Sequence, residues 1–247
     1  MPPPQRKQID NMVDSKATSQ AAAQAAASRA ALNDILLDIQ RKHGHRTIHL
    51  ANALATDGAL LPSGVATLDD LLGGGFLRRK LNMLVSQPTS GAMSLVFNLI
   101  ANAQKRDEVV VFIDMQAALD APYAGQCGVD LKRLFIVTPE TDTQALELVR
   151  DLAATNIVSL IILDGLADIR SLRRLRQSIA AFRTTLLLIS QRPAEAAQLQ
   201  LGVSCANWLY QHQHIIGCQI QARLLRHPNQ ASGSEVTFPL YFASGSD

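Results

Sequence analysis

The stretch LNMLVSQPTSGAMSLVFNLIANA (Leu81–Ala103) has the layout of a phosphate-binding loop, because an apolar strand runs into a small-residue turn and then a helix. In such loops the backbone N–H groups at the start of the helix cradle the phosphates. A lysine that follows the last glycine and the hydroxyl after it complete the grip on phosphate and magnesium. Here Ala92 follows Gly91, and Met93 occupies the hydroxyl position. The stretch therefore predicts the strand, loop and helix without two of the groups that hold the phosphates.

Strands and helices alternate on the C-terminal side of this loop. Glu108–Met115, Val158–Gly165 and Thr184–Gln191 are nearly continuous apolar runs, which is typical of strands buried on both faces. Helical patterns separate these runs, so we predict an α/β fold with a mainly parallel twisted sheet flanked by helices. Arg192–Ser204 is predicted to be a loop, and residues 205–242 are predicted to form antiparallel strands at the C-terminal edge of the sheet.

The N-terminal part differs from the rest of the chain in composition and in hydrophobic periodicity. Residues 1–28 are rich in alanine but have no apolar stripe, so a disordered or weakly helical tail is expected. Residues 29–60 are expected to form a docking helix and strand, followed by a core domain at 61–247. Ile35, Leu36 and Ile39 recur at helical spacing and are the predicted contact with another subunit, since such a small unit cannot bury its own apolar face.

Composition excludes several classes of protein. The 247 residues are 47% hydrophobic and 18% charged, with a net charge of +2, which indicates a globular chain without a strong field of either sign. The three cysteines are scattered, which argues against a disulfide framework or a thiolate zinc site and favours a reducing, cytoplasmic location. No apolar run is long enough to span a bilayer, so no membrane contact is expected.

Two histidines and two aromatic residues lie close together in the C-terminal part of the sequence. His212 and His214 would share a strand face, but they lack further ligands at suitable spacing, so no metal site is expected. Trp208 and Tyr210 would also share a strand face, and we interpret them as core residues rather than a platform for stacking bases.

The order of these features resembles the bacterial RecA recombinase family from about Ala31 to Phe242. Phe112–Gln144 (FIDMQAALDAPYAGQCGVDLKRLFIVTPETDTQ) is the most specific part of the likeness. The resemblance implies a RecA-type core preceded by a polymerisation helix and strand. The small C-terminal domain of that family is expected to be missing.

The resemblance also implies a nucleotide site. The positions of this degenerate site are Ser86, Ser90, Gly91, Ser94, Asp120, Tyr123, Asp164 and Gln191, with Asp120 and Tyr123 on the adenine side. Ser86 replaces the family's opening glycine, and Ser94 places a hydroxyl one residue late. Three positions that carry catalysis in the family are altered, namely Ala92, Met93 and Gln116. Gln116 stands where the family has a glutamate that prepares the attacking water. Because charge stabilisation supplies most of the catalysis of phosphoryl transfer, the chain is expected to be a pseudo-ATPase and not an enzyme. No cofactor is expected beyond weak binding of ATP and magnesium. For Asp120 and Tyr123, a capped turn with a packed ring remains an equal alternative.

The part of the family that binds DNA is altered too. The first DNA-binding loop of the family is expected to be largely deleted, because the segment after Asp164 passes almost directly into the helix SLRRLRQSIAAF. Arg170, Arg173 and Arg174 of this region, with Arg192 of the second loop, are candidate contacts for DNA or for an acidic partner. Arg176 is expected to point elsewhere. A solvated helix face remains the alternative explanation of this charge run.

Leu61–Pro193 also resembles the ImuA-type mutagenesis accessory proteins, on the degraded phosphate loop and the arginine-rich helix. The combined resemblance implies a non-hydrolysing accessory protein of bacterial DNA repair and damage-induced (SOS, translesion) mutagenesis. It would dock to RecA, another RecA-like subunit or polymerase-complex proteins, with single-stranded DNA as a further candidate partner. Two alternatives stay open: an ATP-binding recombinase with an atypical phosphate loop, and a structural regulator that caps RecA filaments.

Overall fold

The computed structural model describes residues 60–168, 171–179 and 181–241. The elements in chain order are β1 (Leu60–Leu61), α3 (Ala66–Leu72), β2 (Phe76–Leu77), β3 (Leu81–Ser86), α4 (Ala92–Gln104), β4 (Val110–Asp114), α5 (Ala121–Gln126), a 3₁₀ turn η1 (Leu131–Arg133), β5 (Leu134–Val137), α6 (Asp142–Ala154), β6 (Leu160–Asp164), α7 (Leu172–Ile179), β7 (Thr185–Ser190), β8 (Leu199–Gln211), β9 (His214–Arg226) and β10 (Glu235–Tyr241). The predicted docking helix, with Ile35, Leu36 and Ile39, lies outside the described residues, and so does Arg170.

Eight strands form one sheet in the order β10-β9-β8-β3-β7-β6-β4-β5. The strands from β8 to β5 pair in parallel, whereas β9 and β10 pair antiparallel at one edge. All five residues of β4 are buried, as expected for a strand covered on both faces. The structure therefore confirms the predicted α/β fold and the antiparallel strands at the C-terminal edge.

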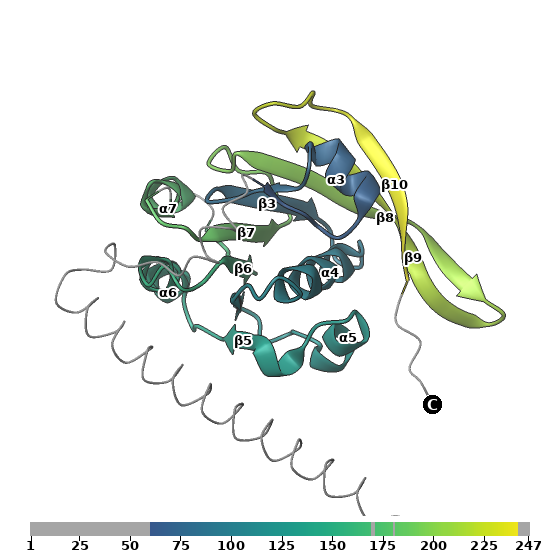
Figure 1. The fold of residues 1–247 in the computed structure, drawn as a ribbon, viewed down its shortest axis with the longest axis horizontal. Coiled ribbons are helices and arrows are strands. Elements are labelled where there is room, and N and C mark those ends of the chain that lie inside the picture. Colours follow the sequence, from purple (N-terminus) through teal and green to yellow (C-terminus); the bar gives the residue numbers. More distant parts are fainter. Residues whose placement is uncertain (1–59, 169–170, 180, 242–247) are drawn as a thin grey trace, which may run out of the picture. The chain divides into compact units, whose positions relative to one another are not determined.

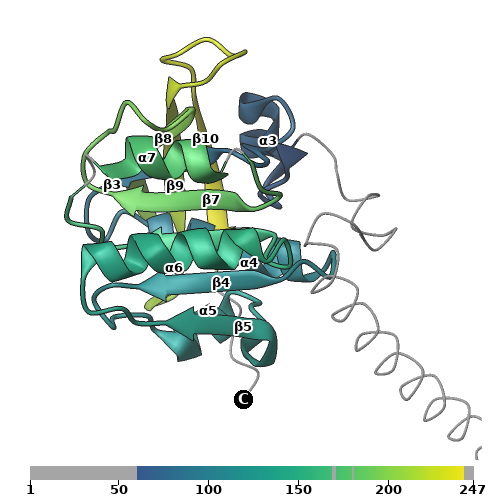
Figure 2. The ribbon, with the colours of Figure 1, turned by 90° about the vertical axis from the view of Figure 1, so that its left-hand side faces the viewer.

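Helices cover both faces of the sheet (Figures 1 and 2). One apolar cluster joins α3 and α4 to the face of the sheet that carries Phe112 and Ile220. A second cluster joins α6 and α7 to the opposite face, which carries Ile113 and Leu188. The alternation of side chains along each strand sends successive residues into the two clusters. The carboxyl ends of the parallel strands are left to form the candidate site.

The predicted loop Arg192–Ser204 is wrong in its second half. From Leu199 this segment is already strand β8, which pairs in parallel with β3. Only the residues from Gln191 to Gln198 cross between the strands, and Ala194, Ala196 and Ala197 of this crossover are buried in the second cluster. Leu199, Leu201 and Val203 alternate with polar or small residues and are buried in the first cluster. This alternation is the period of a half-buried strand, and the loop prediction overlooked it.

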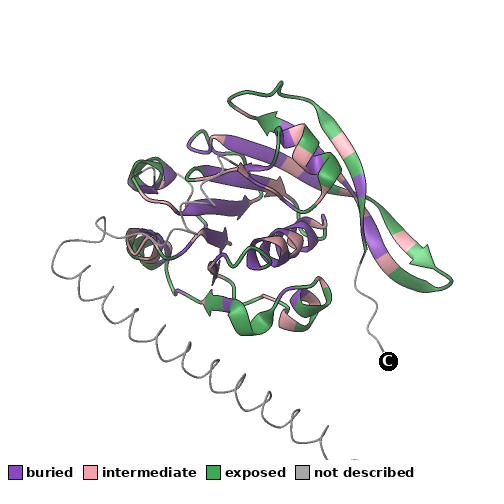
Figure 3. Ribbon diagram, in the orientation of Figure 1, coloured by how far each residue is buried: buried purple, intermediate pink, exposed green. Residues whose placement is uncertain are grey.

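The β8–β9 hairpin extends beyond the sheet as a mostly exposed ribbon (Figure 3). Trp208 and Tyr210 lie on this ribbon with 42% and 61% of their surface exposed. Our interpretation of these two residues as core is therefore wrong. No helix of the described chain covers the sheet that far out.

Among the described residues, no helix has both the length and the apolar character needed to cross a membrane.

Candidate functional site

The loop between β3 and α4 is closed by packing against β9. Gly91 has a φ of +79°, in the left-handed region that favours glycine. A Cβ added to it would lie 2.1 Å from Ile220 Cδ1 and 3.2 Å from Cys218 Sγ. The glycine of this loop is therefore required by the neighbouring strand, whether or not a phosphate binds.

Hydroxyl groups of the loop and of α4 make hydrogen bonds within the protein. Ser90 Oγ accepts a hydrogen bond from the Ala92 N–H at 3.3 Å, so one orphan donor at the helix start already has a partner. Ser94 Oγ and Tyr123 Oη are 2.5 Å apart. The Ala92 side chain is buried. The two hydroxyls are therefore engaged in holding the loop and helix α4 in place.

The two residues predicted on the adenine side hold α5 together. The Asp120 carboxylate caps α5 by accepting a hydrogen bond from Tyr123 N–H at 2.9 Å. The Tyr123 ring meets Phe97 edge-on, with ring centroids 5.7 Å apart. Burial raises the pKa of Tyr123 well above its ordinary value, so its hydroxyl remains protonated. These contacts match the alternative of a capped turn with a packed ring.

Two carboxylates lie side by side at the ends of neighbouring strands. Asp114 of β4 and Asp164 of β6 are register partners. The Asp114 carboxylate accepts hydrogen bonds from the N–H groups of Gln116 at 3.1 Å and Leu119 at 2.8 Å, so it shapes the turn after β4. Burial, with a smaller contribution from Asp114, raises the pKa of Asp164 to about 6, and the Gly165 N–H acts in the opposite direction.

Replacing Asp164 with asparagine is expected to stabilise the protein at neutral pH but not at pH 4. The pKa of this carboxyl is higher in the folded chain, at about 6, than its ordinary value of 3.8. As pH rises the unfolded chain loses its proton first, so the stability falls between these two values. At pH 7.5 we expect Asp164→Asn to gain about 1–2 kcal/mol, discounted for partial solvent exposure. Urea unfolding at both pH values measures this, and an equal effect at both would contradict it.

The residues present do not fit a magnesium–triphosphate in the way the resemblance implies. The buried Ala92 has no ammonium group to offer, Met93 has no hydroxyl, and Ser94 is bonded to Tyr123. Gln116 lies in the turn shaped by Asp114, and Gln191 is exposed just after β7. Ser86 ends β3 and is half-buried. Ala92 and Met93 therefore do not supply the groups that hold the phosphates and the magnesium ion in the family.

The arginines of α7 lie elsewhere, on the face of the sheet opposite α4. Arg173, Arg174 and Arg176 are all exposed, and Arg192 is exposed in the crossover. Arg173 and Arg176 line the same cavity, so the expectation that Arg176 points elsewhere is wrong. Residues three apart on a helix are neighbours on its surface. The cavity also contains Arg226, which sequence analysis missed because it comes from the far end of β9.

Comparison with known proteins agrees with this architecture. The family model described as the RecA N-terminal domain matches residues 30–191, about two thirds of the chain. Protein RecA of Picosynechococcus sp. is 36% identical over 136 residues, which cover 55% of this chain and 39% of the relative. Protein RecA of Petrotoga mobilis is 34% identical, covering 54% and 37%. Protein RecA of Prochlorococcus marinus (strain MIT 9303) is also 34% identical, covering 55% and 36%. The chain thus spans less than two fifths of the length of these relatives.

This relationship contradicts the prediction that the chain is not an enzyme. Its relatives are named RecA, and the resemblance implies ATP hydrolysis for that family. The altered residues Ala92, Met93 and Gln116 limit which groups could carry an activity, but they do not establish that activity is absent. The fold, the order of motifs and the family match over most of the core together show that this chain belongs to the RecA family.

Proposed function

We propose that this chain is an accessory RecA-family protein of bacterial DNA repair, acting in damage-induced mutagenesis by docking to a RecA-like subunit or to a polymerase-complex protein. The observation that carries the proposal is the exposed apolar edge strand β5. Names of relatives support a RecA-like partner, whereas the mutagenesis role rests on the resemblance to the ImuA-type proteins.

Strand β5 ends the sheet on the side away from β10, so one row of its backbone N–H and C=O groups faces outward. Its sequence is LFIV, without charge or proline. Phe135 is 60% exposed and Ile136 is 46% exposed, and Leu131 of the preceding turn is 43% exposed. An apolar edge of this kind is a template for an added strand from another chain.

The opposite edge of the sheet is protected in the usual ways. Strand β10 carries Glu235 at its start and Pro239 in its interior. Charge and proline on an edge strand discourage pairing with another chain. Of the two edge strands of the described sheet, β5 is the one without charge or proline, so we infer that β5 receives the partner. The partner segment we propose is a short strand such as the one predicted within residues 29–60, supplied by a second RecA-like subunit.

Replacing Phe135 with aspartate should weaken docking without unfolding the protein. The side chain is mostly exposed, so the folded chain loses little, whereas the complex loses an aromatic anchor and gains a desolvated charge. We expect the affinity to fall about 30-fold or more, as for a central anchor residue. Sedimentation velocity with the full chain alone, and then mixed with a RecA protein, measures the change.

Tyr241→Asp is the matched control, because Tyr241 is 65% exposed on the opposite edge strand. It should leave the association unchanged. Association that survives Phe135→Asp, or that Tyr241→Asp weakens equally, would mean that β5 is not the docking edge.

A second candidate function is binding of single-stranded DNA. The observation that favours it is the run of exposed arginines Arg173, Arg174 and Arg176 on α7, with Arg192 in the crossover segment. Cations grouped in this way attract phosphates, and the binding weakens steeply with salt. The slope of log affinity against log salt, in a titration with a single-stranded oligonucleotide, counts the phosphates that are neutralised.

A further inference from the structure

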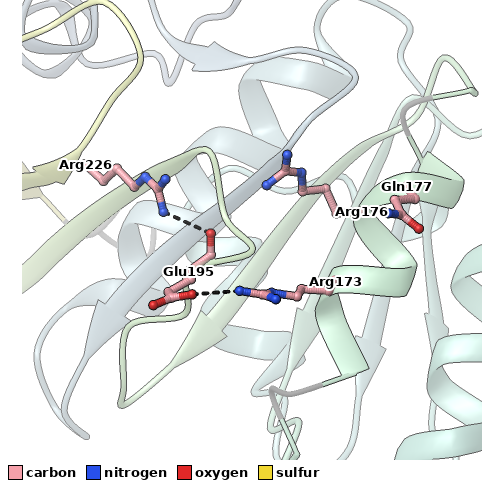
Figure 4. Close-up of a pocket in the computed structure, with 5 residues that line it drawn as sticks. All are labelled: Arg173, Arg176, Gln177, Glu195 and Arg226. Atoms are coloured by element: carbon pink, nitrogen blue, oxygen red, sulfur yellow. Dashed lines mark hydrogen bonds and ion pairs between the residues drawn. The ribbon is translucent and has the colours of Figure 1, made fainter.

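A cavity of about 480 Å³ opens between α7, the crossover and the end of β9 (Figure 4). Its lining is polar and comes from three separate segments, with Arg173, Arg176 and Gln177 on α7, Glu195 in the crossover and Arg226 on β9. The volume falls in the range of roughly 300–1,000 Å³ that small-molecule sites occupy.

A β-bulge brings Arg226 to this face of the sheet. Leu201 pairs with Leu224, but the preceding Gln200 pairs with Arg226, so Leu225 is an extra residue in β9. Leu224 is buried in the cluster on the α4 face. Simple alternation would return Arg226 to that same face, away from α7. The extra residue re-aims the arginine, as bulges commonly do.

The crossover wall of the cavity is held by hydrogen bonds. The buried Gln200 donates from Nε2 to the Ala194 carbonyl at 2.7 Å, and Gln198 Oε1 accepts from Leu81 N–H at 3.0 Å. Glu195 lies between these anchors. Its backbone carbonyl accepts a hydrogen bond from Arg226 at 2.9 Å, and its carboxylate pairs with Arg173 at 2.9 Å (Figure 4). Two of the three guanidinium groups are thereby held at the cavity.

The charges of the lining do not cancel. Three arginines and one glutamate leave a formal charge of +2. Glu195 and Arg173 are both well exposed, at 83% and 77% of their side-chain surface, so their ion pair is weak and open to exchange. Within the described chain, no hydrogen bond or ion pair is made by the Arg176 guanidinium, which extends toward the cavity (Figure 4).

We propose that this cavity binds the terminal phosphate of a nucleic-acid strand. A phosphate monoester carries a charge of about −1.5 to −2 at pH 7, which matches the lining, whereas a backbone phosphodiester carries only −1. Arginine is the side chain best suited to bind phosphate oxygens in a bidentate manner. Gln177 adds an amide that can donate to the ester oxygen or the sugar. That the ligand is a nucleic-acid strand rests on the proposed role in DNA repair. Preference for the terminal phosphate goes beyond that role and beyond binding along the strand.

The experiment compares two otherwise identical single-stranded oligonucleotides, a dT decamer with a 5′-phosphate and one with a 5′-hydroxyl, each carrying a dye at its 3′ end. Fluorescence anisotropy with the full chain measures both affinities. We expect the 5′-phosphate to bind about five- to tenfold tighter, which is modest because the site is open to water. Arg176→Gln or Arg226→Gln should abolish that advantage.

Glu195→Gln distinguishes phosphate binding from a purely structural role of the lining residues, because only phosphate binding predicts a gain. The carboxylate competes with the ligand for Arg173, so its removal raises the charge of the lining to +3 and should increase the advantage of the 5′-phosphate. Arg106→Gln is the matched control, since Arg106 is exposed just after α4, on the opposite side of the sheet. It should leave the advantage unchanged.

Four outcomes would overturn the proposal. In the first, the wild type binds the two oligonucleotides with equal affinity and Arg226→Gln lowers both affinities, which would indicate binding to the backbone phosphates. In the second, inorganic phosphate displaces neither oligonucleotide. A third is tighter binding of a phosphoserine peptide than of its unphosphorylated form, without any effect of the DNA end, which would assign the cavity to a protein partner. The fourth is an advantage of the 5′-phosphate that survives both arginine replacements. None of these outcomes bears on docking through β5, which the Phe135→Asp measurement tests separately.

Discussion

Glu108→Gln is expected to lower the free energy of unfolding by roughly 3–5 kcal/mol, the range for breaking a buried ion pair on one side. Glu108 is 3% exposed and Arg78 is 10% exposed, and the two side chains meet in a double contact at 2.5 and 3.1 Å. Arg78 Nε also donates to the Leu60 carbonyl at 3.0 Å. Glutamine keeps the shape of the side chain but leaves the guanidinium charge buried without its counterion. Denaturation by urea, monitored by circular dichroism, gives the change.

The neighbouring residue offers a matched control. Asp107 pairs with Arg133 at 3.1 Å, but with 87% and 43% of their side-chain surface exposed. Asparagine tolerates the left-handed backbone at this position, where φ is +59°. Asp107→Asn should therefore cost well under about 1 kcal/mol, as exposed pairs do. If the two variants lowered the free energy of unfolding equally, burial would not be what makes the Arg78–Glu108 pair important.

The double variant Arg78→Met/Glu108→Leu separates the net contribution of the ion pair to stability from the cost of burying an unpaired charge. It removes both charges and fills similar volume, so it should be less destabilised than Glu108→Gln alone. A double variant less stable than the single one would show that the ion pair contributes net stability at this site.

Gly91→Ala is expected to destabilise the protein by about 2–4 kcal/mol, as the sum of backbone strain and overpacking. The left-handed φ of +79° is unfavourable for alanine, and the new Cβ would meet Ile220 Cδ1 at 2.1 Å. Thermal unfolding measures the loss. A large effect in the absence of any nucleotide would establish that this loop glycine serves the fold.

Two further variants divide the effect into its parts. Gly233 has a φ of +94° and no heavy atom within 4 Å of an added Cβ, so Gly233→Ala reports the strain alone. Ile220→Val removes the Cδ1 that would collide, so it should recover about 1 kcal/mol in the Gly91→Ala background although it costs stability in the wild type. Strictly additive effects of Gly91→Ala and Ile220→Val would contradict the predicted collision.

The class of fold and most of its elements can be predicted from local patterns in the sequence. The buried strand β4 was visible as a continuous apolar run, and α6 as an apolar stripe on a helical period, because local periodicity reports which faces are covered. The Phe112–Gln144 stretch carried the family resemblance. These are properties of neighbours along the chain, so they can be recognised without coordinates.

The sequence also located the strand–loop–helix around Gly91 but not the reason for it. That reason lies in Ile220 and Cys218, more than a hundred residues further along, and only the pairing of β9 with β8 brings them to the loop. The sequence leaves the roles of Asp120 and Tyr123 open between nucleotide contact and local packing. In the structure Asp120 caps α5 and Tyr123 is hydrogen-bonded to Ser94, contacts that only the fold brings about.

Only the tertiary structure revealed the arginine-lined cavity. Its residues come from α7, the crossover and β9, and a single extra residue at Leu225 decides the face on which Arg226 lies. One residue of register reverses the direction of every following side chain, and no pattern of hydrophobicity around Arg226 signals the bulge. Exposure of Trp208 and Tyr210 was hidden for a related reason. Alternation along a strand identifies the residues that share a face, but what covers that face depends on elements elsewhere in the chain.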